Sequence, residues 1–492
     1  MNPLYNEKYR LQFHFSPKEK WMNDPNGLVY FNDEYHLFFQ FHPFGTTWGP
    51  MHWGHAVSKD LIHWEQLPIA LYPDEHGDIF SGSAVVDWNN TSGFFPDEPG
   101  LVAIYTSADK NPDSDMYLQR QSIAYSKDNG RTWTKYDGNP VLSDASLSDF
   151  RDPKVSWHEE TNRWVMALAT GQSITVFTSR NLKDWEFASE FGKHAGSHDG
   201  VWECPDLFRL PVEGEPSNQK WVLLVSIGDN PEFKEGSRTQ YFIGDFDGTT
   251  FINHYSNETI LWLDHGRDNY AGVSWSDMPT EDSRRVYIGW MSNWRYANQV
   301  PTEGWRSAMT LPRELSLISN ESGYQLVQKV VAEVDTIRKG SQVYNGLLLE
   351  PNQPTSYKLT STLMEINLEF ETLTSTSITI ALQNNEEERT LIRYDAATQQ
   401  LTVDRTNAGV NHFSNAFAIV QEVSLKMENH RIKLQVFIDA SSIEVFANGG
   451  KQAITSLIFP KVPYNQLVLL SYGGNTQISS LKLTELDSIW GK

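Results

Sequence analysis

Short runs of alternating apolar and polar residues fill the chain from residue 21 to about residue 315. Five of these runs follow a polar or turn-like segment, and each is followed by a second run rich in β-branched and aromatic residues. The pairs of runs are 28–31 with 35–41, 84–86 with 101–106, 155–157 with 163–169, 207–208 with 220–227, and 273–275 with 285–291. This period of two predicts paired β-strands.

A further pattern follows the paired strands and also repeats. Segments 56–64, 124–133 and 177–185 share an apolar run, a polar turn and a Trp at a nearly fixed offset, and 243–251 is a looser copy that ends in Phe. These segments are typical of two outer strands, so each repeat holds four strands. Four-stranded repeats of this length indicate a β-propeller, and five copies predict five blades in residues 1–315.

The pattern changes after about residue 338. Strand-like alternation runs through 357–374, 377–382, 391–403 and 432–471, with turn signals at short spacing, which predicts an antiparallel β-sandwich over residues 340–492. Residues 316–339 are interpreted as a connector that is partly helical, because Val327, Val330, Val331 and Val334 are near helical spacing. The predicted fold is all-β: a five-bladed β-propeller followed by a C-terminal antiparallel β-sandwich.

Composition and charge exclude some classes of function and favour others. The formal charge of −22 disfavours nucleic-acid and anionic-membrane partners, and the 13% aromatic content suits the apolar faces of sugars. The single cysteine, Cys204, excludes an internal disulfide. The first thirty residues lack the pattern of a signal peptide, which predicts a cytoplasmic protein if the chain is complete and an extracellular one if a leader has been removed. Oligomeric state is left open.

The predicted blades bring distant carboxylates together. In a propeller the first strand of each blade lines the central channel, so residues at the starts of these strands converge at one end of it. Those positions hold Asp24, Ser81, Asp152, Glu203 and Asp268. Four carboxylates at one funnel repel one another, which favours a functional site.

Glycoside hydrolysis needs one ionised and one protonated carboxyl group beside the scissile bond. Asp24 suits the ionised nucleophile, and Glu203, with the higher ordinary pKa, suits the acid/base. We expect Arg151 to hold Asp152 ionised as an acceptor for sugar hydroxyls. A structural alternative for Asp24 is that Asp24-Pro25-Asn26-Gly27 forms a β-turn leading into the first strand.

Four sequence blocks resemble those of glycoside hydrolase family 32, the invertase, inulinase and levanase family. The blocks are Trp21-Met22-Asn23-Asp24-Pro25-Asn26-Gly27, Phe80-Ser81-Gly82-Ser83, Arg151-Asp152-Pro153 and Glu203-Cys204-Pro205-Asp206. Segments 48–55 and 293–298 are most similar to the bacterial levanase and exo-inulinase branch.

The resemblance implies a retaining, exo-acting β-fructofuranosidase that uses no metal or cofactor and acts on levan, inulin or sucrose. It implies that Asp24 is the nucleophile, Glu203 the acid/base and Asp152 the transition-state stabiliser. It also implies a fructose pocket shaped by Asn23, Gln40, Trp48, Phe80, Ser81, Arg151 and Trp290.

Several alternatives stay open at this point. The enzyme could act mainly on sucrose and short oligosaccharides, it could be an arabinan hydrolase, or the propeller could bind sugar without catalysis. His52, His55 and His63 could suggest zinc, but the interleaved Trp and Gly favour a packed turn and strand. Cys204 is expected to pack or to influence Glu203, because neighbouring carboxylates disfavour a thiolate.

Overall fold

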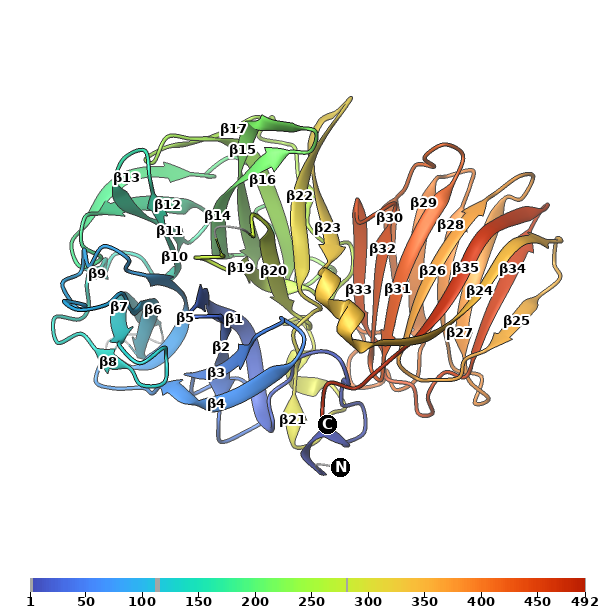
Figure 1. The fold of residues 1–492 in the computed structure, drawn as a ribbon, viewed down its shortest axis with the longest axis horizontal. Coiled ribbons are helices and arrows are strands. Elements are labelled where there is room, and N and C mark those ends of the chain that lie inside the picture. The colour runs from blue at the N-terminus through green and yellow to red at the C-terminus, as the bar shows by residue number, and fades with distance from the viewer. Residues whose placement is uncertain (1–2, 111–115, 280–281, 492) are drawn as a thin grey trace.

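A computed structural model of the chain describes residues 3–110, 116–279 and 282–491. Its regular structure is nearly all strand, which confirms the all-β prediction. Figure 1 shows a propeller, coloured blue to yellow, beside a β-sandwich, coloured orange to red. Among the described residues, no helix has the length and apolarity needed to cross a membrane.

The propeller strands form five antiparallel sets, each built outward from an inner strand. The inner strands are β1 (Lys20–Phe31), β5 (Asp78–Val86), β10 (Phe150–His158), β14 (Trp202–Val212) and β19 (Tyr270–Ser274). Each contacts the next, and β19 contacts β1, so the inner strands close a ring. This ring brings the strand starts to one end of the channel.

The outer strands follow the order expected from the repeat. The second strands are β2 (Glu34–His42), β6 (Leu101–Lys110), β11 (Arg163–Thr170), β15 (Glu215–Ile227) and β20 (Arg285–Trp290). The third are β3 (His52–Ser58), β7 (Tyr117–Ser126), β12 (Ile174–Ser179), β16 (Arg238–Phe246) and β22 (Arg313–Asn320). The outermost are β4 (Trp64–Leu71), β8 (Thr134–Lys135) with β9 (Leu142–Ser143), β13 (Trp185–Phe191), β17 (Phe251–Asn253) with β18 (Leu261–Trp262), and β23 (Gly323–Val330).

Three short elements complete the propeller half. They are the 3-10 helices η1 (Pro3–Tyr5) and η2 (Ala297–Gln299) and strand β21 (Trp305–Arg306). Strand β21 pairs in parallel with the start of β1, through Lys20 and Trp21. This pairing joins the last part of the propeller chain to its first blade.

The segment 316–339 is mostly strand. β22 and β23 form a hairpin whose β22 pairs with β20 and touches β14, so Val327 and Val330 lie on a propeller strand. The helical interpretation is wrong for Val327 and Val330, because their backbone pairs with β22. Only the 3-10 helix η3 (Ala332–Ile337), which buries Val334, is helical.

The sandwich consists of two six-stranded sheets. One holds β24 (Arg338–Leu349), β35 (Thr476–Leu486), β26 (Met364–Glu371), β31 (Ile432–Asp439), β32 (Ser442–Ala447) and β33 (Gln452–Leu457). The other holds β25 (Thr355–Lys358), β34 (Gln466–Tyr472), β27 (Ser377–Gln383), β28 (Arg389–Asp395), β29 (Gln400–Asn407) and β30 (Val420–Ser424). Aliphatic side chains from alternate positions of both sheets form their common core.

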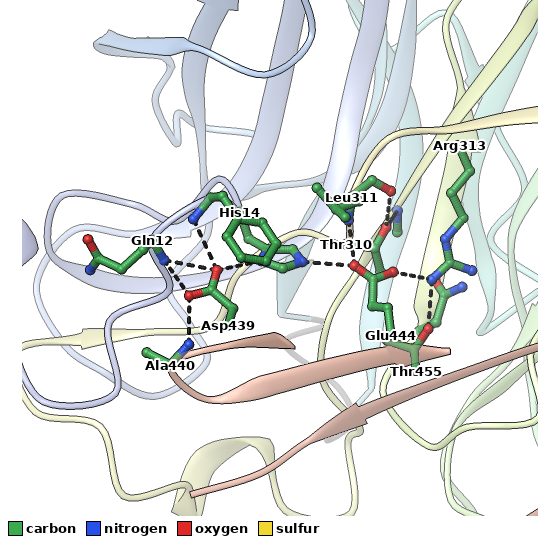
Figure 2. A network of polar contacts seen from close by, with 12 residues as sticks. Gln12, His14, Thr310, Leu311, Arg313, Asp439, Ala440, Glu444 and Thr455 are labelled. Carbon is green, nitrogen blue, oxygen red and sulfur yellow. Dashed lines mark hydrogen bonds and ion pairs between the residues drawn. The ribbon is translucent and has the colours of Figure 1, made fainter. Parts of the chain in front are cut away.

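A row of buried, alternating charges joins the two halves (Figure 2). His14 contacts Asp439 and Glu444, each at 2.8 Å, and Glu444 accepts a 2.5 Å bond from Arg313. Arg313 also contacts Asp264 at 3.0 Å. Burial alone would lower the pKa of His14, but hydrogen bonds to its two carboxylate neighbours raise that pKa to about 9.

Candidate active site

Every inner strand has a bulge at the same depth. In each blade the antiparallel pairing of the inner strand with the second strand shifts its register at one position near the start of the inner strand. The shifts lie between Met22 and Pro25, Ile79 and Gly82, Arg151 and Lys154, Glu203 and Asp206, and Tyr270 and Val273. A bulge frees backbone groups and redirects side chains. The bulges hold Asp24, Ser81, Asp152 and Cys204, with Glu203 and Arg151 just before them, so these side chains meet in one place.

The β-turn alternative for residues 24–27 is wrong, because β1 runs straight through them. Its ladder to β2 shifts on both sides of Pro25 and Asn26, so the polar residues form an irregular part of a strand. Gly27 is required there: its φ is 54°, and a Cβ would lie 2.6 Å from the ring of Phe38. The irregularity fixes the backbone beside Asp24.

Both oxygens of Asp24 accept hydrogen bonds. Ser81 Oγ donates to Oδ2 at 2.7 Å, and Asn23 Nδ2 donates to Oδ1 at 3.0 Å. The indole of Trp21 donates to Asn23 Oδ1 at 2.8 Å and so orients its amide. Burial raises the pKa of the Asp24 carboxyl, while the bonds from Ser81 and Asn23 favour its ionised form.

Asp152 is buried on the neighbouring side of the site. Its φ of 63° is unusual for a residue other than glycine, and its N–H donates to Thr106 Oγ1 at 3.0 Å. Burial raises the pKa of its carboxyl to about 7, although the positive charge of Arg151 opposes this. The guanidinium of Arg151, 4.0 Å away, favours the ionised form of Asp152 as expected, but burial works against it.

Glu203 is anchored at both oxygens. Arg151 Nη2 donates to Oε1 at 2.9 Å, and the hydroxyl of Tyr270 donates to Oε2. Arg151 is itself held by Asp149, at 2.5 Å, and by Gln119, at 3.3 Å. The carboxyl of Glu203 thus has a fixed orientation, with one cation and one phenol on its two sides.

Cys204 links the other two acids. Its N–H donates to Asp152 Oδ2 at 3.0 Å, and its thiol lies 3.5 Å from the same oxygen and 3.6 Å from Asp24 Oδ2. Burial, with the three surrounding carboxylates, raises the pKa of the thiol well above its ordinary value. A protonated thiol is a weak donor, so Cys204 tethers Asp24 and Asp152 from below.

The channel beneath the acids is closed. Lys154 Nζ lies 3.3 Å from Asp206 Oδ1 and donates to the carbonyl of Ser274 at 2.6 Å, with both charged groups buried. The space beside Lys154, which Asp152 and Cys204 also line, is about 10 Å³, close to the least that holds one water. This space is too small for a sugar ring, so a sugar cannot reach the acids past Lys154.

Aromatic rings border the site. Phe80 lies edge-on to Trp48 and also contacts Tyr117, with ring centroids 5.7 Å apart in both pairs, and Trp48 is 36% exposed. Trp290 is fully buried against Trp21, Trp294 and Tyr270. The structure therefore places Trp48 and Phe80 at the edge of the site and Trp290 in the packed layer behind it.

Gln40 is also buried beneath the site. Its amide donates to Asn26 Oδ1 at 2.8 Å and to the carbonyl of Ile79 at 3.0 Å. Ile79 directly precedes the Phe80 and Ser81 bulge. Gln40 therefore fixes the spacing between the first two inner strands, and with it the Ser81 to Asp24 contact.

Asp268 does not join the other acids. Its carboxylate pairs with Arg405 of the sandwich at 2.5 Å and accepts a 2.6 Å bond from Tyr296. The prediction that Asp268 is the fourth carboxylate of the site is wrong, because the bulge of the fifth inner strand follows Tyr270 and not Asp268. The side chain that strand contributes to the site is therefore a phenol.

The three histidines considered for zinc have separate surroundings. His55 contacts His36 at 3.0 Å, His63 contacts Asp60 at 2.8 Å, and His52 packs between Phe44 and Tyr72. Within the described ranges, no group of three or more His, Cys, Asp or Glu residues is arranged to hold a metal.

Sequence reasoning missed Tyr270, Asp149 and Gln119. Tyr270 becomes apparent only when the inner strands are aligned on the residue that follows each bulge, which matches Val273 with Asp206 and Lys154. In that alignment Tyr270 shares a position with Glu203 and Arg151. Asp149 and Gln119 had no such signal, since they act through Arg151.

Comparisons with known proteins agree with this geometry. The profile of the glycosyl hydrolases family 32 N-terminal domain matches residues 14–330, and that of the C-terminal domain matches residues 333–485. Levanase of Bacillus subtilis is 51% identical over 492 residues, which cover 99% of this chain and 72% of the levanase. An extracellular exo-inulinase of Aspergillus niger is 41% identical over 519 residues, covering 99% and 96% of the two chains.

A solved structure shows the same fold. The crystal structure of exo-inulinase from Aspergillus awamori matches with a TM-score of 0.90 and 39% identity, over 99% of this chain and 100% of that one. Both family profiles, the relatives and this structure thus agree over nearly the whole length. The chain is a glycoside hydrolase and belongs to glycosyl hydrolases family 32.

Proposed function

We propose that this protein is a retaining, exo-acting β-fructofuranosidase that releases terminal fructose from levan, inulin and sucrose. The observation that carries the proposal is the joint placement of three acids with different partners: Asp24 with Ser81 and Asn23, Asp152 with Cys204, and Glu203 with Arg151 and Tyr270. The levanase, exo-inulinase and invertase names of similar proteins support the substrate class.

In the first step Asp24 attacks the anomeric C2 of the fructosyl unit. The bond from C2 to the leaving oxygen breaks, Glu203 gives its proton to that oxygen, and a fructosyl ester forms on Asp24. Hydrogen bonds from Ser81 and Asn23 hold the attacking carboxylate in place, which limits the motion needed for attack.

In the second step Glu203 takes a proton from water as the water oxygen attacks C2. The ester bond breaks, fructose leaves with the β configuration kept, and Asp24 is again a carboxylate. Asp152 accepts hydrogen bonds from fructose hydroxyls, and it does so best when ionised. Arg151 orients Glu203 and contributes positive charge beside the reacting centre.

The closed channel supports exo action. With Lys154 paired to Asp206 and little space beside it, a chain cannot pass through the propeller, which favours binding of a terminal residue at the acids. Trp48 forms part of that mouth. Free fructose should therefore be the first product from levan, and early oligosaccharides would contradict exo action.

Hydrolysis of sucrose, inulin and levan by wild type, Asp24→Ala and Glu203→Ala tests the assignment. Both variants should lose at least about 10³-fold in kcat while keeping their fold. A small external nucleophile such as azide should restore turnover in Glu203→Ala with an activated substrate, giving a β-fructosyl product. Unchanged hydrolysis in either variant, or an α product, would refute the proposal.

Two alternatives are separated by the same assays. A non-catalytic sugar-binding propeller would release no fructose, and an arabinan hydrolase would act on arabinan but not on fructosides. A product-bound crystal structure should also show the Asp24 and Glu203 carboxyl groups about 5 to 5.5 Å apart, as retention requires.

The compartment follows from the substrate class. Polymeric fructans are too large to cross a cell membrane unaided, and the Aspergillus niger relative is named as extracellular. We therefore place the enzyme outside the cell membrane, which fractionation of the source cells with an antibody would test. Activity confined to the cytoplasm would contradict this and would favour sucrose or short oligosaccharides as substrates.

A further inference from the structure

One end of the first blade carries a row of aromatic rings outside the pocket. Trp21 at the start of β1 pairs with His42 at the end of β2, Phe41 pairs with His52 at the start of β3, and Trp53 pairs with Leu71 at the end of β4. These strand ends therefore share the edge of the sheet where Asp24 lies. They run outward from the channel across the blade.

Three rings in this row touch in sequence. The ring centroids of Phe44 and His52 are 5.8 Å apart, and those of His52 and Tyr72 are 5.6 Å apart, both with edge-to-face geometry. Phe44 is 72% exposed and Tyr72 is 55% exposed, whereas His52 lies beneath them at 5%. The row thus presents two exposed rings on one buried support.

His52, the buried ring beneath Phe44 and Tyr72, is uncharged at neutral pH. Burial lowers the pKa of His52 below its ordinary value. Lys135 donates a 2.5 Å bond to the carbonyl of Tyr72 and pairs with Asp74 at 2.5 Å, so its charge is compensated while it holds Tyr72 in place. A neutral platform with fixed rings suits an uncharged sugar better than an ionic ligand.

The loop that carries Phe44 is part of the active-site wall. Residues 43–51 join β2 to β3, and the loop contributes Trp48 to the pocket mouth and Met51 to the buried cluster with Trp21, Cys204 and Tyr270. The carbonyl of Gly45 accepts the N–H of Trp21 at 3.0 Å. The position of Phe44 is therefore fixed relative to Asp24.

We infer that Phe44 and Tyr72, supported by His52, bind the part of a fructan chain that lies beyond the terminal residue in the pocket. This inference rests on the proposed function and names where the polymer lies. Single exposed apolar side chains are ordinary on a protein surface. Here the two rings are joined through His52, and Phe44 belongs to the loop whose Trp48 contacts Phe80 at the edge of the site, so a chain held by its end in the pocket can extend onto them.

Kinetics on substrates of different length tests the inference. The ratio of kcat/KM on levan to kcat/KM on sucrose should fall about fivefold in Phe44→Ala and Tyr72→Ala, and about tenfold or more in the double variant, through a higher KM for levan. Sucrose leaves too little beyond the pocket to cover both rings. A ratio equal to that of wild type, or an equal loss on both substrates, would overturn the inference.

Matched variants separate stacking from loss of structure. Phe187→Ala removes a 67% exposed ring from β13 in another blade and should leave the ratio unchanged. Tyr72→Phe keeps the ring and should also keep the ratio, whereas Tyr72→Leu keeps the apolar contact with His52 but should lower it. A lower levan-to-sucrose ratio in Phe187→Ala would show that loss of any exposed ring lowers activity on levan, and not loss of Phe44 and Tyr72 in particular.

Binding without turnover gives a readout that does not depend on catalysis. In the Asp24→Ala background, retardation of the protein in a gel containing levan should fall when Phe44 and Tyr72 are both replaced by Ala. Equal retardation would overturn the inference even if the enzyme is active. Absence of fructoside hydrolysis by wild type would instead refute the proposed function, so the two failures are distinguishable.

Discussion

The backbone N–H of Cys204 donates to Oδ2 of Asp152 at 3.0 Å, although the two residues belong to different blades. The donor directly follows Glu203, and its thiol also reaches Asp24. One residue therefore couples the positions of all three acids. A change in its side chain should alter catalysis more than folding.

Cys204→Ala removes the thiol contacts to Asp24 and Asp152 but keeps the main-chain bond. We expect kcat to fall about tenfold, since a weak buried donor is lost from two carboxylates, with a small change in melting temperature. Steady-state kinetics and thermal unfolding measure the two effects. Cys204→Ser, which keeps a donor, should lie between wild type and Cys204→Ala, and wild-type kcat in Cys204→Ala would contradict the coupling.

Asp152→Asn should stabilise the free protein in a pH-dependent way. The folded-state pKa of about 7 lies above the ordinary 3.8, so the stability from this carboxyl is full below pH 3.8 and is lost as pH rises through 7. The amide has no charge to desolvate, so the variant should gain about 2 to 4 kcal/mol at pH 8 but little at pH 4. Urea unfolding at both pH values measures this gain.

The same substitution should remove activity, because an amide cannot act as an anionic acceptor for fructose hydroxyls. A loss of about 10³-fold in kcat/KM is expected. An equal stability gain at pH 4 and pH 8 would show that packing, rather than ionisation of Asp152, limits the stability of the free site.

Arg151→Lys tests the geometry that holds Glu203. The guanidinium contacts Glu203, Asp149 and Gln119 together, whereas an ammonium group cannot match this planar set. We expect kcat on sucrose to fall about 100-fold in Arg151→Lys. It should fall further in Arg151→Met, which also lacks the charge. Equal activity in Arg151→Lys and wild type would mean that charge alone suffices.

His14→Gln should weaken the joint between the two halves in a pH-dependent way. The folded-state pKa of about 9 exceeds the ordinary 6.5, so the stability from this proton is full below pH 6.5 and is lost as pH rises through 9. The variant should lose about 3 kcal/mol at pH 6, because Asp439 and Glu444 then lack their shared cation, and less at pH 10. Denaturant titrations at both pH values test this.

The repeat architecture and the three acids could be predicted from sequence because both leave local signals. Alternation marks each strand, and Asp24, Asp152 and Glu203 each stand just before an apolar run. The bulges leave no such signal, since the position at which the register shifts depends on how the inner strand pairs with its partner strand. The start of the fifth inner strand therefore predicts Asp268 as the site residue, whereas the register places Tyr270 there.

The valines at 327–334 show the same limit. Spacing in a short apolar segment fits both a helix and a strand; pairing with β22 makes Val327 and Val330 part of a strand, whereas Val334 lies in the 3-10 helix η3. Contacts between the propeller and the sandwich could not be predicted from the sequence either. Arg405 and Asp268 are 137 residues apart, and the residues around each give no sign that the two side chains pair.

The buried pairs between the halves bear on how the gene can be cut and recombined. Asp268 and Arg313 lie in the catalytic half, but their partners Arg405 and Glu444 are encoded later, in the sandwich, and all four side chains are fully buried. A gene shortened before residue 340 would yield a propeller in which Asp268 has lost Arg405 and Arg313 keeps only Asp264 as a counter-ion. A chimaera that takes its second half from a relative will need the matching arginine and glutamate, so the two halves can be exchanged only as a matched pair.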